Sequence, residues 1–382
     1  MNDNVNSQIG FFAQISNTIT NPFVKDWKEK DGAVVGYFCP VLPEELLMAA
    51  GFFPFLMRGT GSDNTNQADE YFRSSSNCSF PRHCFNLALE GKYGFLDGVV
   101  MGTTCDTLKN VMKNWSISPI GTPFVYMVNT PHVSGEVMAE YYRGELAKFR
   151  AALEEHFKVE ITDEKLGAAI KTCNETRELQ RQLYALRKLE NPPLSGSDIV
   201  SVMVAGTSMP KELYNAKLKQ LLADIGETEI GGKKKLRLML VGSCGDDTLF
   251  TQIVEELGAV VVADETCFGG KVIHGKVDEE NKDPLDALAR YQIVDNPICA
   301  KMANMRDARR EAVLSAVSEY QVDGVLGQRL GCCDTWGVEL YILHEQLLAA
   351  GIPSMMLERE YVPDNIGQVS TRVQAFLETM GG

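Results

Sequence analysis

Ten cysteines are the residues of this chain with the clearest capacity for chemistry. They are Cys39, Cys78, Cys84, Cys105, Cys173, Cys244, Cys267, Cys299, Cys332 and Cys333. In one interpretation most of them are small buried hydrophobic residues. In the other, a subset supplies thiolates to a metal ion or an iron–sulfur cluster, because soft sulfur ligands suit both. The number of cysteines alone leaves both interpretations open.

Two of these cysteines, Cys105 and Cys333, occupy matching positions in the two halves of the sequence. Cys105 follows the apolar run DGVVM and Cys333 follows DGVLGQ; each then precedes an aspartate and an expected helix. Open parallel sheets bind ligands at the carboxyl ends of their strands, and a helix N-terminus lowers the pKa of a thiol. Cys39 also ends an expected strand, and Cys78 lies in a polar loop before a helix. Their spacing matches no local ferredoxin-like motif, so the fold would have to bring them together.

Other motifs for catalysis or cofactor binding are missing from the sequence. The chain has no G-x-x-x-x-G-K-[ST] phosphate loop and no G-x-G-x-x-G dinucleotide fingerprint. It also has no H-E-x-x-H motif and no G-x-S-x-G nucleophile elbow, and its five histidines form no metal-binding pair. The sequence therefore contains no recognisable site for ATP hydrolysis or for NAD.

The elements that must position the cysteines are short apolar runs separated by helical patterns. Strands are expected at 33–38, 52–57, 97–101, 124–128, 236–241, 259–263, 324–326 and 354–357. Strands that alternate with helices predict a parallel α/β sheet. Between residues 134 and 225 the pattern is purely helical, with apolar residues such as Leu146, Phe149 and Leu153 on one face.

The sequence therefore predicts an α/β protein with two doubly wound parallel-sheet domains and a helical segment between them. We expect an N-terminal α/β domain at residues 1–135, a helical bridging segment at 136–231 and a C-terminal α/β domain at 232–382. The glycine- and lysine-rich stretch 231–235 is expected to be a solvated hinge, with phosphate binding by its lysines as the alternative.

Composition excludes several classes of function. The chain of 382 residues has a formal charge of −14, which argues against nonspecific nucleic-acid binding. No apolar run approaches the roughly 20 residues of a membrane span, and the N-terminus shows no secretory signal. We therefore expect a cytoplasmic protein, in a reducing compartment where structural disulfides are rare.

Six segments of the sequence have to be considered together. They are YFCPVLPEELLMAAG, NCSFPRHC, LDGVVMGTTCDT, ADETCFG within 242–269, GCCDTWGVE within 322–339, and LEREY with GQVSTRVQAFLE within 357–378. Together, in this order and over nearly the whole chain, they resemble the 2-hydroxyacyl-CoA dehydratase / benzoyl-CoA reductase family. The resemblance implies a [4Fe–4S] cluster on three cysteines of each large subunit.

The same resemblance implies a set of partners. These are an acyl-CoA substrate, a homologous cluster-binding subunit, a separate ATP-hydrolysing iron–sulfur activator or ATPase subunits, and ferredoxin as the electron donor. The missing phosphate loop agrees with a division of labour in which a partner hydrolyses ATP.

Carried over residue by residue, the resemblance assigns three cluster ligands. Cys78, Cys105 and Cys333 match the three ligand positions of the family. Cys84 and Cys332 are nearby competitors for two of them. Cys244, Cys267 and Cys299 match no ligand position of the family, and Cys173 is expected in the core. The resemblance leaves open whether the cluster is a single or a double cubane.

One acidic residue and two arginines complete the candidate site. Glu45 matches the family's acid near the acyl group; alternatively, it only stabilises the start of its helix through the helix dipole. Arg73 and Arg82 are candidates for contacts with CoA phosphates, which arginine binds through paired N–H groups; surface salt bridges are an equal alternative.

The C-terminal segments resemble the smaller benzoyl-CoA reductase subunit more than the dehydratases. This implies a two-electron reduction of an aromatic acyl-CoA to a cyclohexadiene acyl-CoA, coupled to ATP hydrolysis on partner subunits. The alternatives are a 2-hydroxyacyl-CoA dehydratase subunit that removes water through a ketyl radical, a double-cubane reductase of small molecules, and a non-catalytic electron-transfer partner.

Overall fold

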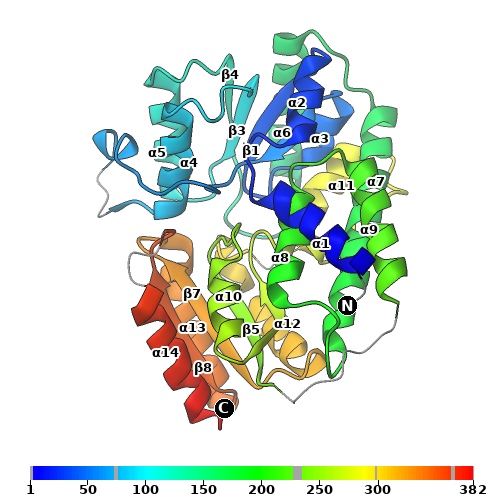
Figure 1. Cartoon of the computed structure of the whole chain (residues 1–382). Coiled ribbons are helices and arrows are strands. Elements are labelled where there is room, and N and C mark those ends of the chain that lie inside the picture. The colour runs from blue at the N-terminus through cyan, green and yellow to red at the C-terminus, as the bar shows by residue number, and fades with distance from the viewer. Residues whose placement is uncertain (1–2, 73–75, 227–234, 297–298, 363–365, 382) are drawn as a thin grey trace.

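Two parallel sheets form the frame of the molecule (Figure 1). The computed structural model describes residues 3–72, 76–226, 235–296, 299–362 and 366–381. The first sheet has the order β2-β1-β3-β4 and is built from β1 (Val34–Phe38), β2 (Phe53–Leu56), β3 (Gly98–Gly102) and β4 (Phe124–Val128). The second has the order β6-β5-β7-β8 and is built from β5 (Arg237–Gly242), β6 (Val260–Glu265), β7 (Gly324–Leu330) and β8 (Ser354–Arg359). The predicted α/β fold with two doubly wound parallel sheets is confirmed.

The central strands are apolar because helices cover both faces of each sheet. Every residue of β1, β3 and β5 is buried. The first sheet is accompanied by α2 (Pro22–Glu29), α3 (Glu44–Ala49), α4 (Ser79–Leu89) and α5 (Asp106–Ile117). The second is accompanied by α10 (Leu249–Glu256), α12 (Arg306–Glu319), α13 (Asp334–Ala349) and α14 (Ile366–Thr379).

Both sheets reverse their strand order at a corresponding point. In the first sheet this point lies between β1 and β3, which pair in parallel from Val35 and Gly98 to Phe38 and Met101. In the second it lies between β5 and β7, which pair up to Gly242 and Gln328. Open α/β sheets bind ligands outside the carboxyl ends of the strands at such a point. The topology therefore marks two places for a site, one in each sheet.

Helices fill the segment between the two sheets. They are α6 (Glu136–Phe157), α7 (Asp163–Ala185), α8 (Gly196–Ala205) and α9 (Lys211–Ile225). Helix α7 packs on α3 of the first half, and α8 packs on α10 and β6 of the second. The N-terminal helix α1 (Asp3–Ser16) packs on α8 and α9 (Figure 1). The boundary at 135/136 stays a prediction, and the expected hinge lies almost wholly outside the described residues.

A segment from the second half joins the core of the first. Helix α11 (Pro284–Arg290) packs on α6, and Leu288, Tyr291 and Ile293 belong to the same hydrophobic core as the first sheet. The chain then returns to the second sheet through Cys299 and Lys301. The Nζ atom of Lys301 donates a hydrogen bond to the carbonyl of Pro131 at 2.8 Å. This excursion carries residues of the second half into the space between the sheets.

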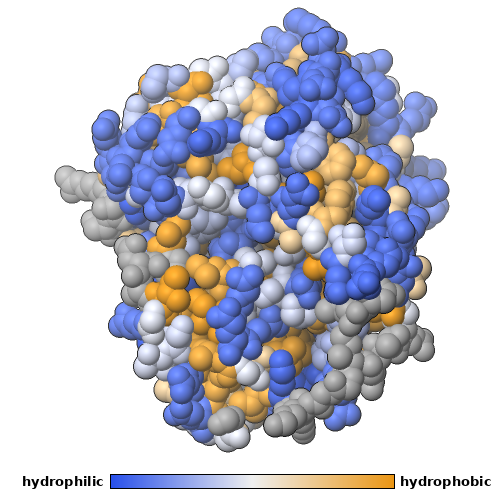
Figure 2. All heavy atoms as spheres, in the orientation of Figure 1, coloured by the Kyte–Doolittle hydropathy of each residue, from blue (hydrophilic) through white to orange (hydrophobic). Residues whose placement is uncertain are grey.

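The outer surface is mostly hydrophilic on the face drawn in Figure 2, with apolar residues gathered in its lower half. None of the helices within the described ranges is both long and apolar enough to cross a membrane.

Candidate functional site

Seven of the ten cysteines line one cavity, which we call the thiol cavity. It encloses about 770 Å³ of unfilled space, part of it open to solvent, and its cysteines are Cys39, Cys78, Cys105, Cys244, Cys267, Cys299 and Cys333. Five of these seven come shortly after the carboxyl ends of β1, β3, β5, β6 and β7. The two sheets therefore direct their strand ends toward one shared space.

Three of these residues, Cys78, Cys105 and Cys333, form the first thiol group. They are the N-cap residues of α4, α5 and α13. The thiols of Cys78 and Cys333 are hydrogen-bonded to each other. The helix N-termini carry partial positive charge, which stabilises anions. All three ligand residues predicted from the sequence thus line one cavity, and three helix N-termini meet there.

The pKa values within this group follow from hydrogen bonding and burial. The hydrogen bond from Cys78 lowers the pKa of Cys333 to about 6. That same bond, followed by burial, raises the pKa of Cys78. Burial also raises the pKa of Cys105, although its sulfur accepts a hydrogen bond from the amide of Leu108 at 3.4 Å. The helix amide of Leu108 lowers the pKa of Cys105, as expected, but desolvation by burial outweighs it.

The other four, Cys39, Cys244, Cys267 and Cys299, form the second thiol group. A hydrogen bond from Cys244 lowers the pKa of Cys267 to about 6 and raises that of Cys244. Burial raises the pKa of Cys39 to about 12, and the neighbouring Cys299 and Cys267 add to the rise. Sequence reasoning assigned no role to these four cysteines. Three of them could have been found from the sequence, because Cys39, Cys244 and Cys267 each follow the end of an expected strand. Cys299 lies in a loop, and no sequence pattern indicated it.

The two competitors for the ligand positions lie elsewhere. Cys84 is fully buried and faces Asp246 and Tyr93 rather than the thiol cavity. Cys332 is exposed, and its backbone has a φ of +58°, in the left-handed region. That turn separates it from Cys333, which lines the cavity.

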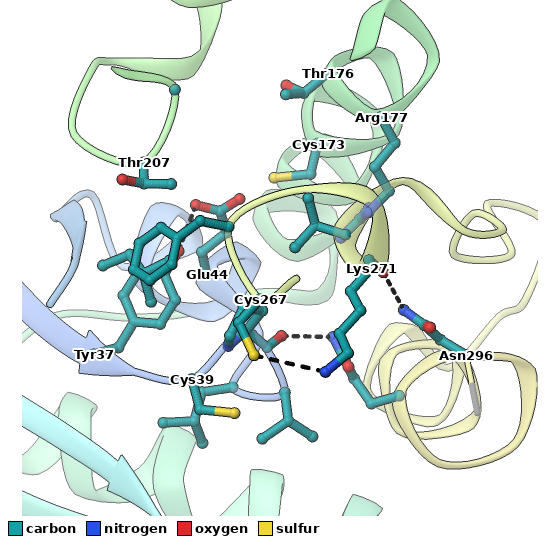
Figure 3. A pocket seen from close by; sticks show the side chains of 18 of the residues that line it. Tyr37, Cys39, Glu44, Cys173, Thr176, Arg177, Thr207, Cys267, Lys271 and Asn296 are labelled. Carbon is teal, nitrogen blue, oxygen red and sulfur yellow. Dashed lines mark hydrogen bonds between the residues drawn. The ribbon is translucent and has the colours of Figure 1, made fainter. Parts of the chain in front are cut away.

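A second pocket, which we call the polar pocket, adjoins the thiol cavity (Figure 3). It encloses about 1030 Å³ of unfilled space, including the part open to solvent. Both spaces share the residues Cys39, Pro40, Leu56, Cys267, Phe268, Lys271, Cys299 and Lys301. The second thiol group therefore contributes three of its four cysteines to the shared wall, whereas the first group contributes none.

Glu45 lies in the wall of the polar pocket and is 1% exposed. Its Oε1 atom accepts a hydrogen bond from Arg177 at 2.5 Å, and its Oε2 atom has no hydrogen-bond partner among the described residues. The guanidinium of Arg177 also stacks 4.7 Å from the centre of the Tyr291 ring. Sequence reasoning missed Arg177, because 132 residues separate it from Glu45. Glu45 thus has one oxygen held in an ion pair and one buried oxygen without a hydrogen-bond partner among the described residues.

The neighbouring acid is also neutralised. Glu44 pairs with Lys211 at 2.8 Å and accepts a hydrogen bond from Tyr37 at 3.1 Å. By contrast, the guanidinium of Arg82 is buried and pairs with Asp69 at 2.5 Å. Arg73 lies outside the described residues.

The donor atoms that line the thiol cavity are mainly cysteine sulfurs. In the described part of the chain, no three His, Cys, Asp or Glu side chains converge closely enough to hold one metal ion. The thiol cavity is lined by cysteines from both halves, and thiolates are the ligands of iron–sulfur clusters. The residues present therefore have the chemistry to hold such a cluster.

The chain is similar to several known proteins over most of its length. The sequence model of the 2-hydroxyglutaryl-CoA dehydratase D-component matches residues 39–380. The chain is 30% identical to the putative dehydratase subunit YjiM of Escherichia coli K12, over 94% of both chains. It is 26% identical to a benzoyl-CoA reductase subunit of Thauera aromatica, over 90% of both. It is 24% identical to the (R)-phenyllactyl-CoA dehydratase beta subunit of Clostridium sporogenes, over 97% of this chain and 98% of that one.

Proposed function

Because the chain belongs to the family of the 2-hydroxyglutaryl-CoA dehydratase D-component, we propose that it is an iron–sulfur redox subunit with its cluster site in the thiol cavity. Cys78, Cys105 and Cys333 would hold one [4Fe–4S] unit, as the sequence resemblance implies. The second thiol group provides enough further sulfur for another unit. The function best supported is therefore that of a double-cubane reductase. The single observation that carries it is the convergence of seven thiols on one cavity.

When bound, iron–sulfur clusters of this kind hold electrons at low potential and transfer them one at a time. The residues of this chain determine the charge and polarity around the proposed cluster site. Lys271 and Lys301 place buried positive charge beside the thiols, and Phe268 and Leu56 exclude water from the shared wall. Low polarity and nearby cations both govern how readily a buried site takes up negative charge.

The polar pocket is the proposed substrate site. Arg177 and Lys211 neutralise Glu45 and Glu44, so a polar substrate does not meet two unpaired acids. The Oε2 atom of Glu45 is placed to accept a hydrogen bond from a substrate, or to exchange a proton with it. Glu45 is thus the proposed catalytic acid or base.

A second candidate function is reduction of an aromatic acyl-CoA, as in benzoyl-CoA reductase. It rests on the similarity to the benzoyl-CoA reductase subunit of Thauera aromatica. Dehydration of a 2-hydroxyacyl-CoA is supported equally by the similarity to dehydratase subunits. For either reaction we propose a homologous cluster-binding subunit, ferredoxin and an ATP-hydrolysing activator as partners in a reducing cytoplasm.

Anaerobic purification with iron and sulfide analysis tests the proposal. Two cubanes correspond to about eight iron atoms per chain, and one cubane to about four. A chain that takes up no iron and sulfide, even after reconstitution, overturns the cluster proposal.

Turnover assays with an ATP-dependent activator and a low-potential donor then separate the reactions. A cyclohexadiene acyl-CoA indicates the aromatic reductase, and an enoyl-CoA formed without net reduction indicates the dehydratase. Reduction of small molecules without CoA supports the double-cubane reductase. A loaded chain that turns over no substrate is an electron-transfer partner.

A further inference from the structure

Lys271 is a buried cation in the wall that separates the thiol cavity from the polar pocket. It is 7% exposed and lines both spaces (Figure 3). Its Nζ atom lies 3.7 Å from the sulfur of Cys267 and 4.6 Å from the centre of the Trp336 ring. The ammonium thus touches the second thiol group on one side and faces the proposed substrate site on the other.

The charge of Lys271 is not used in an ion pair. Within the described residues, no carboxylate lies within salt-bridge distance of its Nζ atom. Burial of an ammonium without a carboxylate is unfavourable unless another group supplies compensating negative charge. The nearest groups are the sulfur of Cys267, a weak hydrogen-bond acceptor, and the face of Trp336, which attracts cations. Cys299, Cys244 and the carboxylate of Glu265 act on the ammonium from farther away. The position of this ammonium therefore favours an electrostatic interaction with the cysteines of the second thiol group.

The loop that carries Lys271 is held rigidly. The carboxylate of Asp264 accepts hydrogen bonds from the amide of Gly270 at 2.9 Å and from Arg187 at 2.9 Å. A Cβ atom on Gly269 would lie 1.8 Å from the Oδ1 atom of Asp264, and one on Gly270 would lie 2.0 Å from its carbonyl oxygen. Only glycine fits at these two positions. The tight turn places Cys267 and Lys271 on the same side, four residues apart.

We propose that Lys271 is the fixed positive charge that compensates the thiolates of the second group and the electrons that they help to store. This inference rests on the proposed cluster site. Because the same ammonium lines the polar pocket, the matching substrate class is a small electron-accepting molecule that gains negative charge on reduction. Lys271 acts on the reaction by making electron uptake more favourable.

Redox titration of the holoprotein tests the inference. Lys271→Met keeps the aliphatic stem and removes the charge; Lys271→Arg keeps the charge. We expect Lys271→Met to bind wild-type amounts of iron and to lower the equilibrium constant for one-electron reduction at least tenfold, a shift of about 59 mV. Lys271→Arg should stay near the wild type. Lys188→Met is the matched control, because Lys188 also lies over an aromatic ring, that of Tyr320, but away from the thiols.

The outcomes of this experiment distinguish a failure of the proposed cluster function from a failure of the proposed role of Lys271. A wild-type chain without iron defeats the proposed function itself. A loaded Lys271→Met chain with unchanged potential defeats only the inference. If Lys271→Met folds but takes up no iron while Lys271→Arg does, the requirement for charge is supported. If Lys271→Met and Lys271→Arg both fold and both lose iron, the loss does not come from removal of the positive charge, and the inference is overturned.

Discussion

The backbone amide of Asp106 donates a hydrogen bond to the side chain of Asp334 across 3.1 Å. These residues are 228 positions apart, and each is the first residue of the helix that follows Cys105 or Cys333. The bond fixes the starts of α5 and α13 beside each other. The switch points of the two sheets therefore face each other, which is why a single cavity receives cysteines from both halves.

The adjacent cysteines give the first prediction. Cys333→Ser should lose the cluster or leave it labile, because Cys333 lines the thiol cavity. Cys332→Ser should keep most of the iron and the activity, because Cys332 is exposed and turned away by its left-handed backbone. Iron and sulfide analysis of anaerobically purified variants makes the comparison. Retained iron in Cys333→Ser together with an empty Cys332→Ser would reverse the assignment.

Much of the frame could be predicted from local sequence. All eight expected strands are present, because each is a short apolar run bounded by turns. The three members of the first thiol group were assigned by the family resemblance, and local pattern alone indicated only that they lie before expected helices. The ion pair of Glu45 with Arg177 and the excursion that brings Cys299 and Lys301 into the wall could not be predicted, since both depend on contacts between distant segments.

The segment LEREY shows another limit of sequence reasoning. Arg359 bonds to Gln328 at 3.0 Å, and Tyr361 donates a hydrogen bond to Asp246 at 2.9 Å. Asp246 also accepts a hydrogen bond from the amide of Gly59, so Tyr361 and Asp246 tie the two halves together. These residues line neither proposed site, although the Tyr361 ring packs against Phe80 in the wall of the thiol cavity. The LEREY segment therefore carries no direct information about the reaction, whereas the other segment that resembles the reductase branch, QRLGCCDTWGVE, contains Cys333 of the thiol cavity.

The second thiol group gives the next prediction. Cys244→Ser and Cys299→Ser should each lower the iron content by about half if the cavity holds two cubanes. Cys173→Ser is the matched control, because Cys173 is buried and lines only the polar pocket. Electron paramagnetic resonance on the same samples reports whether the remaining cluster is intact. Full iron content in both Cys244→Ser and Cys299→Ser would exclude a second cubane on these thiols.

Glu45 and Arg177 can be separated by a double-mutant cycle. Arg177→Met should destabilise the chain by about 3–5 kcal/mol, because it leaves a buried carboxylate without its partner. Glu45→Gln should reduce turnover by about 10²–10⁴-fold if the residue exchanges a proton with substrate.

The double variant Glu45→Gln/Arg177→Met should recover stability in denaturant unfolding, because neither charge is left unpaired. Its turnover should stay low. Recovery of both stability and turnover would mean that Glu45 serves only the fold.

The last prediction concerns pH. Burial lowers the pKa of His274, but the charge of Glu265 and its hydrogen bond at 2.8 Å outweigh burial and raise that pKa above its usual value. Protonated His274 therefore stabilises the folded state fully below the unfolded pKa of about 6.5. This stabilisation disappears as pH rises through the higher folded pKa. Denaturant unfolding of the cluster-free chain should show a fall in stability over that range. This fall in stability should be smaller in His274→Gln. It should be unchanged in His344→Gln, because the His344 ring is hydrogen-bonded to Ser354 and not to a carboxylate. An equal fall in the wild type and in His274→Gln would show that another group causes it.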